Sequence, residues 1–198
     1  MDVRDVRTGA SLWKRTFDKD LPGVFPDAIS ERIAFVWRAT AQSARDEVRR
    51  DPELRKRLDA LREAEGDFIV QVVDARAGKP LGTVFVETGK GSFSLVGVAT
   101  SGDFLAVEDS ANRTRVYAIA SGDMKGRVFG RSALLHGGRS LLAVMNGNRV
   151  SLHDANTLTL HQELMFGRTV SFTAFSSDGT KLMALTSNHE VIVVDVSK

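Results

Sequence analysis

The sequence contains no cysteine, which excludes disulfide bonds, thiolate metal ligands and cysteine nucleophiles. It also lacks any apolar run of about 18 residues, the length that a membrane-spanning helix requires. The net charge is only +2 over 198 residues, and acids are interleaved with bases rather than separated from a basic face. We therefore expect no nucleic-acid partner and no membrane partner.

Sequence features of catalytic and cofactor sites are scarce as well. The chain has no Gly-x-Ser-x-Gly elbow, phosphate loop or zincin helix, and Gly89-Lys-Gly91 lacks the strand–loop–helix context of a phosphate cradle. The four histidines have no paired metal-ligand spacing; they are His136, His153, His161 and His189. Asp103 and Asp178 fall in equivalent turns, which favours a role in forming the turns over a role as catalytic acids. We predict no catalytic residues, no cofactor and no metal site.

What the sequence does contain is a repeat of short strands and turns. In the clearest copy, residues 170–175 alternate as a strand, Ser176-Ser-Asp-Gly179 forms a turn, and apolar strands follow at 182–185 and 191–194. A strand at 160–166 is assigned to the same copy and makes four. Similar strand–turn–strand series recur upstream, around residues 29–36, 95–117 and 132–153.

One strand of each copy has an alanine in the same position. These residues are Ala34, Ala106, Ala143 and Ala184. The last three are 37 and 41 residues apart, and the first interval of 72 equals one period plus an insertion. A small residue between large apolar neighbours suits a crowded inner strand.

A second repeated feature is an Asp-led turn that is followed by a further strand. Asp5-Val-Arg-Thr-Gly9 and Asp74-Ala-Arg-Ala-Gly78 share one register, residues 118–122 are an eroded copy, and Asp154 is followed by Leu158 where glycine stood. The Asp side chain can accept a bond from the backbone two residues on, and glycine permits the reversal.

A period near 40 residues with four short strands is typical of propeller blades, which stack because one blade cannot bury both faces alone. The predicted fold class is all-β: four four-stranded antiparallel blades of a partial or open β-propeller with one helical insertion. The chain forms a single propeller region, 1–198, with blades at about 10–74, 79–118, 123–154 and 158–196. Sandwiches and barrels also contain short strands, but they do not predict a fixed period.

The final repeat resembles a WD-repeat blade, with its Ser-x-Asp-Gly turn, Leu-x-Ala strand and apolar strand closing on Asp195. The resemblance covers about three quarters of the chain and implies a protein-binding propeller. The Trp-Asp pair of the family is absent, because the residues before the aspartates are Val73, His153 and Val194. A second segment, Asp5 to Trp13, looks like the tryptophan-docking turn of quinoprotein-like propellers, which implies the blade fold without the quinone cofactor.

Residues 38–67 interrupt the repeat and are predicted to be helical. Thr40 is a candidate cap for a first helix reaching about Arg50, and Asp51-Pro52 is a good start for a second. Leu54, Leu58 and Leu61 then share one face. The leucine stripe either packs against the protein itself or contacts a partner. The arginine-rich face of the insertion is a second candidate contact surface, and its arginines are Arg49, Arg50, Arg55 and Arg57.

These features favour a non-catalytic protein-interaction or scaffold module, with protein partners. The alternative is a sensor or accessory propeller of a larger bacterial enzyme, such as a hydrolase, kinase or quinoprotein, whose catalytic part lies upstream. The first residues lack the apolar core of a secretory signal, so a cytoplasmic location is expected, or a periplasmic one if the chain is truncated. Residues 1–5 are expected to be an outer strand without a partner in the chain, so that preceding blades or a second copy in a homodimer complete a seven- or eight-bladed ring.

Overall fold

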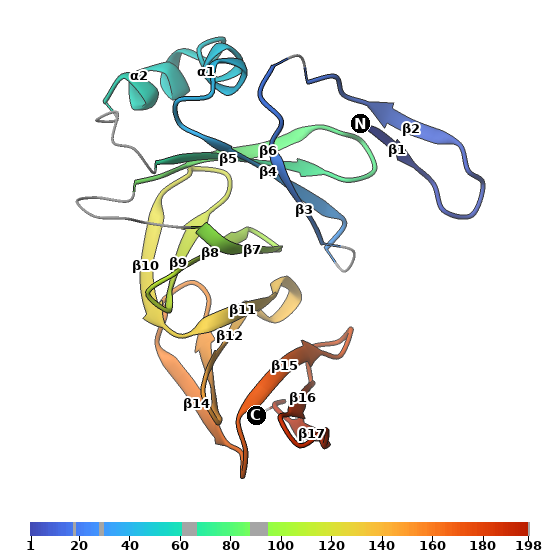
Figure 1. Ribbon diagram of the computed structural model, residues 1–198, viewed down its shortest axis with the longest axis vertical. Helices are drawn as coiled ribbons and strands as arrows, with labels where there is room; N and C mark the ends of the chain where they lie inside the picture. The colour runs from blue at the N-terminus through green and yellow to red at the C-terminus, as the bar shows by residue number, and fades with distance from the viewer. Residues whose placement is uncertain (18, 28–29, 61–66, 88–94, 198) are drawn as a thin grey trace. The chain divides into compact units, whose positions relative to one another are not determined.

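The computed structural model describes residues 1–17, 19–27, 30–60, 67–87 and 95–197. In these segments the chain forms 17 strands, two α-helices and one 3-10 helix, and every strand pairing is antiparallel (Figure 1). The structure confirms the all-β class and the successive blade-like sheets of a partial propeller. The predicted loop at 89–91 and Leu61 lie outside the described residues.

The chain divides into two compact units. The N-terminal unit comprises residues 1–94 and 119–122, and the C-terminal unit comprises residues 95–118 and 123–198. The elements of the N-terminal unit are β1 (Asp2–Arg4), β2 (Ser11–Lys14), β3 (Gly23–Asp27), β4 (Arg32–Arg38), α1 (Gln42–Val48), α2 (Pro52–Ala60), β5 (Phe68–Asp74) and β6 (Pro80–Val86).

The N-terminal unit is built on a four-stranded sheet in the order β3-β4-β5-β6, next to the β1-β2 hairpin. One face of this sheet carries alternate residues of β4, namely Ile33, Phe35 and Trp37, opposite Val73, Gln71 and Ile69 of β5. The apolar residues of this set, all but Gln71, form a core with side chains from α1, α2 and the 1–17 segment. The helical insertion and the hairpin therefore cover one face of the sheet.

The C-terminal unit contains three sheets in chain order. Their strands are β7 (Leu95–Ser101), β8 (Phe104–Asp109), β9 (Arg113–Ala118), β10 (Met124–Phe129), β11 (Arg131–His136), β12 (Leu141–Asn146), β13 (Arg149–Asp154), β14 (Leu160–Met165), β15 (Val170–Phe175), β16 (Lys181–Thr186) and β17 (Val191–Asp195). One apolar cluster joins the β7–β10 sheet to the β11–β14 sheet, and another joins β11–β14 to β15–β17. Each sheet thus uses a neighbour to bury a face that it cannot bury alone.

The four repeated alanines occupy equivalent positions, as predicted. Ala34, Ala106, Ala143 and Ala184 lie on β4, β8, β12 and β16, the second strand of each sheet, and none is more than 1% exposed. An alanine here leaves room for the larger side chains of the neighbouring strands. The repeat detected in the sequence is therefore a repeat of packing.

The Asp-led turns also form as predicted. Oδ1 of Asp5, Asp74 and Asp154 accepts the backbone N–H two residues on, at 2.8, 2.9 and 2.9 Å. The fifth position takes a left-handed conformation at Gly9, Gly78 and Gly122, and Leu158 adopts φ 59° in the copy that lacks glycine. Bonds from the Thr8 and Arg7 N–H groups lower the pKa of Asp5, and bonds from Thr157 and Asn156 lower that of Asp154.

The sheets begin one strand later than the repeats predicted at 10–74, 79–118, 123–154 and 158–196. The strand after each Asp-led turn pairs with the strand before it, so β14 pairs with β13 from Arg149↔Met165 to His153↔Leu160. The prediction that residues 160–166 belong to the last blade is wrong. A tight turn returns the chain alongside the strand it has just left, so β14 joins the preceding sheet. The last sheet therefore has three strands among the described residues.

The prediction that residues 1–5 lack a partner is also wrong. β1 pairs with β2 across the Asp5 turn, with Asp2 opposite Lys14 and Val3 opposite Trp13. Here too, the strand that follows an Asp-led turn pairs with the strand that precedes it. Trp13 then docks on the next Asp-led turn: its Nε1 donates to the Ala75 carbonyl at 2.8 Å, and its ring lies against Gly78, where a Cβ would come within 2.7 Å.

Candidate functional site

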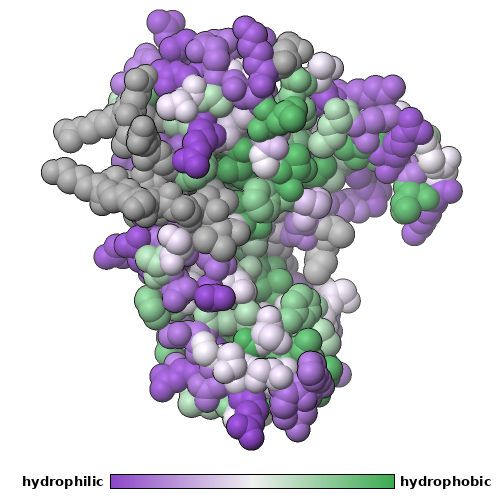
Figure 2. Space-filling view, in the orientation of Figure 1, coloured by the Kyte–Doolittle hydropathy of each residue, from purple (hydrophilic) through white to green (hydrophobic). Residues whose placement is uncertain are grey.

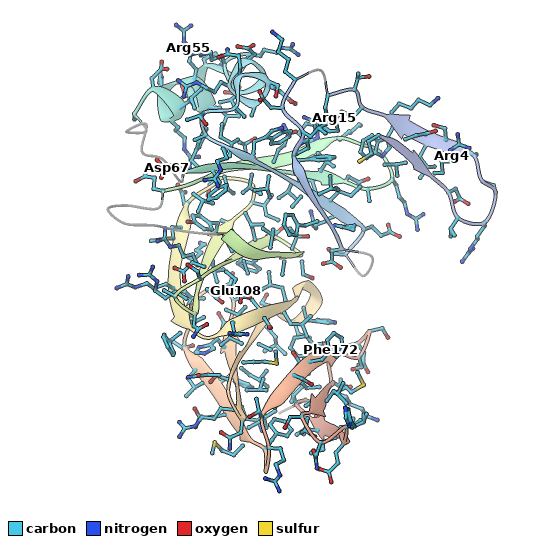
Figure 3. All side chains as sticks on the ribbon, viewed as in Figure 1. Arg4, Arg15, Arg55, Asp67, Glu108 and Phe172 are labelled. Carbon is cyan, nitrogen blue, oxygen red and sulfur yellow. The ribbon has the colours of Figure 1, made fainter. Side chains whose placement is uncertain are left out.

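The most distinctive surface of the C-terminal unit is one face of the β15–β17 sheet. Two cross-strand rows form it: Phe172, Leu185 and Val191, and beside them Ala174, Met183 and Val193. We call these six residues the C-terminal apolar face. Phe172, Val191 and Val193 are 52%, 61% and 59% exposed, and Figure 3 shows the Phe172 side chain on β15.

The opposite face of the same sheet is buried. There Phe175, Leu182 and Ala184 are at most 7% exposed and belong to the cluster shared with the β11–β14 sheet. Strand β17 therefore has the alternation of a half-buried strand, although every residue from Val191 to Val194 is apolar. A strand that is apolar on both sides is typical of a sheet covered on both faces, so the C-terminal apolar face has the composition of a contact surface.

Strand β17 is also an edge strand. Among the residues that the structure describes it pairs with β16 alone, whereas β5, β9 and β13 each pair with strands on both sides. Beyond it, Asp195 Oδ1 accepts the Ser197 N–H at 2.9 Å, the same bond that starts the other Asp-led turns. An edge strand presents unpaired backbone N–H and C=O groups that another strand can join.

The N-terminal unit contains a cavity of about 520 Å³ that residues 15–17, Lys19 and residues of α1 line, and we call it the N-terminal cavity. Its lining includes Arg15, Lys19, Trp37, Glu47 and Arg50. A neighbouring hollow of about 390 Å³ shares Lys19 and Trp37 with it. This volume is in the range of small-molecule sites.

Arg15 is the most constrained charged group in this cavity. Its guanidinium carbon lies 5.3, 4.7 and 5.5 Å from the ring centroids of Phe17, Phe35 and Trp37, and its Nη2 forms an ion pair with Glu47 of α1. Three aromatic faces and a carboxylate hold the cation in place. Lys19 and Arg50, by contrast, have no ion-pair partner among the residues that the structure describes.

The helical insertion packs mainly on its own unit. Leu58 is 2% exposed, Leu54 is partly buried, and both belong to the core that covers β4 and β5. Asp51 Oδ1 caps α2 by accepting the N–H groups of Glu53 and Leu54, as predicted. Thr40 does not cap α1: the helix starts after Ala41, and Asp20 instead accepts the Ser43 N–H at 3.2 Å.

The arginines of the insertion do not form one free basic face. Arg57 donates to the Ser121 and Gly122 carbonyls and lies over the Phe85 ring. Arg49 is paired with Asp46 at 3.8 Å and Arg55 with Asp59 at 3.9 Å. Hydrophilic side chains surround the helices in Figure 2, but acidic and basic groups alternate there, which fits a solvated surface.

The structure distributes the histidines and turn aspartates over separate places. His136 Nε2 lies 3.1 Å from the Ser177 carbonyl oxygen, and His153 Nδ1 lies 3.1 Å from that of Leu158. Asp178 is held by the Ser176 hydroxyl and by the Thr180 N–H, and these bonds lower its pKa to about 2. Its carboxylate is engaged in shaping the turn, as the sequence predicts.

Within the described segments, no three His, Asp or Glu side chains gather as metal ligands would. None of the helices in those segments is both long and apolar enough to cross a membrane. No protein-family model matches the chain, and no curated protein matches it.

Proposed function

We propose that this chain is a non-catalytic protein-interaction module on WD-repeat-like propeller blades, and that it contacts its partner through the C-terminal apolar face. The observation that carries this proposal is the exposure of three large apolar side chains, Phe172, Val191 and Val193, on one face. Contiguous exposed apolar surface is typical of interaction sites.

The composition of the face supports a protein rather than a small ligand as partner. Its two cross-strand rows are flat and apolar, and none of its six residues is charged. The centres of protein interfaces are depleted of charge in the same way. The partner is expected to bring an apolar sheet or helix face of similar extent, and a second copy of this chain is one such partner.

Site-specific photo-crosslinking tests this proposal. A photoreactive phenylalanine analogue at position 193 is expected to form a covalent adduct with one protein in the cells that express this chain naturally. Position 6 is the matched control, because Val6 is 98% exposed and lies outside the face. Sedimentation velocity on the purified chain separates a partner from a homodimer.

The substitution Val193→Lys places a charge in the centre of the face and is expected to abolish the adduct or the dimer. Val6→Lys is expected to leave both unchanged. Equal crosslinking at positions 193 and 6, together with a monomeric chain, would contradict the proposal.

The N-terminal cavity favours a second candidate function, a sensor or accessory domain that binds a small anion. Lys19 and Arg50 line the cavity without ion-pair partners among the described residues. Succinate and inorganic phosphate are suitable probes in a thermal unfolding assay, because a ligand that binds only the folded state raises the unfolding temperature. Arg50→Gln is expected to remove that shift and Arg55→Gln to preserve it; no shift at millimolar probe would exclude this function.

A further inference from the structure

A buried carboxylate of the C-terminal unit has no cationic partner among the described residues. Glu108, on β8, is 9% exposed and receives one hydrogen bond, from the backbone N–H of Ser132 at 2.5 Å. No Lys, Arg or His of the described residues forms an ion pair with it. Burying a carboxylate without a compensating charge is costly, so the surroundings of Glu108 indicate what it could bind.

Glu108 lines a cavity between the β7–β10 and β11–β14 sheets, and Figure 3 shows it between them. The cavity has a volume of about 140 Å³, and besides Glu108 and Ser132 its lining is apolar and mostly small: Gly97, Val98, Ala99, Ala106 and Ala133. Ser132 is exposed and Gly97 and Ala99 are partly exposed, so solvent reaches the site.

The size and lining of the cavity restrict its occupant. A single water takes about 30 Å³ of liquid volume, whereas a cavity of about 150 Å³ holds a guest as large as benzene. A divalent metal needs several oxygen ligands, and no group of three acidic or histidine side chains surrounds Glu108 in the described part of the chain. An alkyl chain can instead lie against the alanines while its charged end meets the carboxylate.

We propose that the Glu108 cavity binds a primary alkylammonium group. The ammonium nitrogen donates to the Glu108 carboxylate, and the methylene groups pack against Ala99, Ala106 and Ala133. The group comes either from a free small amine or from a lysine side chain of a protein partner. The site is distinct from the C-terminal apolar face and does not depend on it.

Titration of the isotope-labelled full chain with n-butylammonium chloride, followed by amide NMR shifts, tests the proposal. Saturable shifts are expected at Gly97, Ser132 and Ala133, with a dissociation constant on the order of 1 mM, as suits one charged contact and a small apolar one. Butan-1-ol has the same carbon chain without the charge and is expected to give no saturable shift. Equal shifts with the alcohol, or none with the amine, would overturn the proposal.

Two substitutions test the roles of charge and space. Glu108→Gln keeps an acceptor for the Ser132 N–H but removes the charge, so affinity for the amine is expected to fall about tenfold or more. Gly97→Ala narrows the cavity without a clash, since its Cβ would lie 3.5 Å from Glu108 Oε2, and is expected to weaken binding while the chain stays folded. Unchanged affinity in both variants would refute the assignment.

The source of the ammonium group is resolved by a second ligand. A Gly-Lys-Gly peptide with blocked ends is compared with butylammonium: tighter binding of the peptide assigns the site to a partner lysine, and tighter binding of the amine assigns it to a free amine. Val193→Lys, which disrupts the proposed interaction face, is expected to bind either ligand as the wild type does. Failure of the interaction proposal is thereby distinguishable from failure of this one.

Discussion

The first four-stranded sheet and the last sheet of this protein have similar strands but differ in what covers them. On β3–β6, the face containing Phe35 and Ile69 is covered by α1, α2 and the 1–17 segment, and both residues are at most 1% exposed. On the exposed face of β15–β17, Phe172 and Val193 are both more than half exposed. Strand composition is apolar in both, so the difference comes from the inserted helices and hairpin, which the last sheet lacks among the described residues.

This comparison indicates that an apolar sheet face is structural when the chain covers it and available for contact when the chain does not. Substitutions in the two sheets, in the helices that cover the first and in the turns probe this difference.

Replacing one phenylalanine in each sheet tests the comparison most directly. Phe35→Ala removes a ring that lies 5.5 Å from Phe17 and 5.9 Å from Trp37, and it is expected to lower the free energy of unfolding by about 3–5 kcal/mol. Phe172→Ala should cost about 1 kcal/mol or less, because half of the side chain is already in water. Urea denaturation measures both, and equal losses would show that cover by other segments does not decide how much a sheet face contributes to stability.

The helical cover is tested by Leu58→Ala. Leu58 is the 2% exposed residue on the buried side of α2, and truncation of a buried leucine is expected to cost about 2–5 kcal/mol. Arg55→Ala, on the exposed side of the same helix, is the control and should change stability by about 0.5 kcal/mol or less. If urea unfolding shows no difference between these two variants, α2 does not contribute to the core of its unit.

Two glycines with the same backbone angle, one in the β1–β2 hairpin and one in the last sheet, differ in what surrounds them. Gly9 and Gly179 both have φ +69°, but a Cβ on Gly9 meets nothing within 4 Å, whereas one on Gly179 would lie 2.7 Å from the His136 ring. Gly9→Ala should cost about 1 kcal/mol from backbone strain alone. Gly179→Ala should cost about 1 kcal/mol more because His136 must move; thermal unfolding that ranks them in the opposite order would contradict this contact.

The smallest effect concerns the turn between β15 and β16. The Ser176 hydroxyl and the Thr180 N–H hold the pKa of Asp178 at about 2, below its ordinary value of 3.8. Because the folded-state pKa is the lower one, the ionised carboxylate stabilises the folded state above about pH 4, and this contribution is lost as the pH falls towards 2. The difference in urea midpoint between the wild type and Asp178→Asn should shrink over that interval, and a constant difference would show that the charge is not involved.

Much of the fold was predictable because local chemistry determines it. The positions of Ala34, Ala106, Ala143 and Ala184, the Asp-led turns and the Asp51 cap all depend on residues within a few positions of one another. The strand that follows each turn was assigned to the next sheet, although it belongs to the preceding one. The reason is that a sequence repeat and a sheet of a propeller need not start at the same strand.

The candidate sites were much less predictable. The run Val191-Ile-Val-Val194 suggests a strand buried on both faces. Only the packing of the sheets shows which of its faces is exposed to solvent. Arg15 meets Glu47 across 32 residues and Ser132 meets Glu108 across 24. No local sequence signal specifies such partners.

The all-β class, the period of the repeat, the turns and the place of the helical insertion can be read from the amino-acid sequence. These properties follow from side-chain alternation and turn chemistry, which act between near neighbours. The sequence does not show which sheet faces are covered, which strand is an edge or which carboxylate is buried without a cationic partner among the described residues. Those properties depend on packing between segments that are distant in sequence, and burial exists only once these segments have come together.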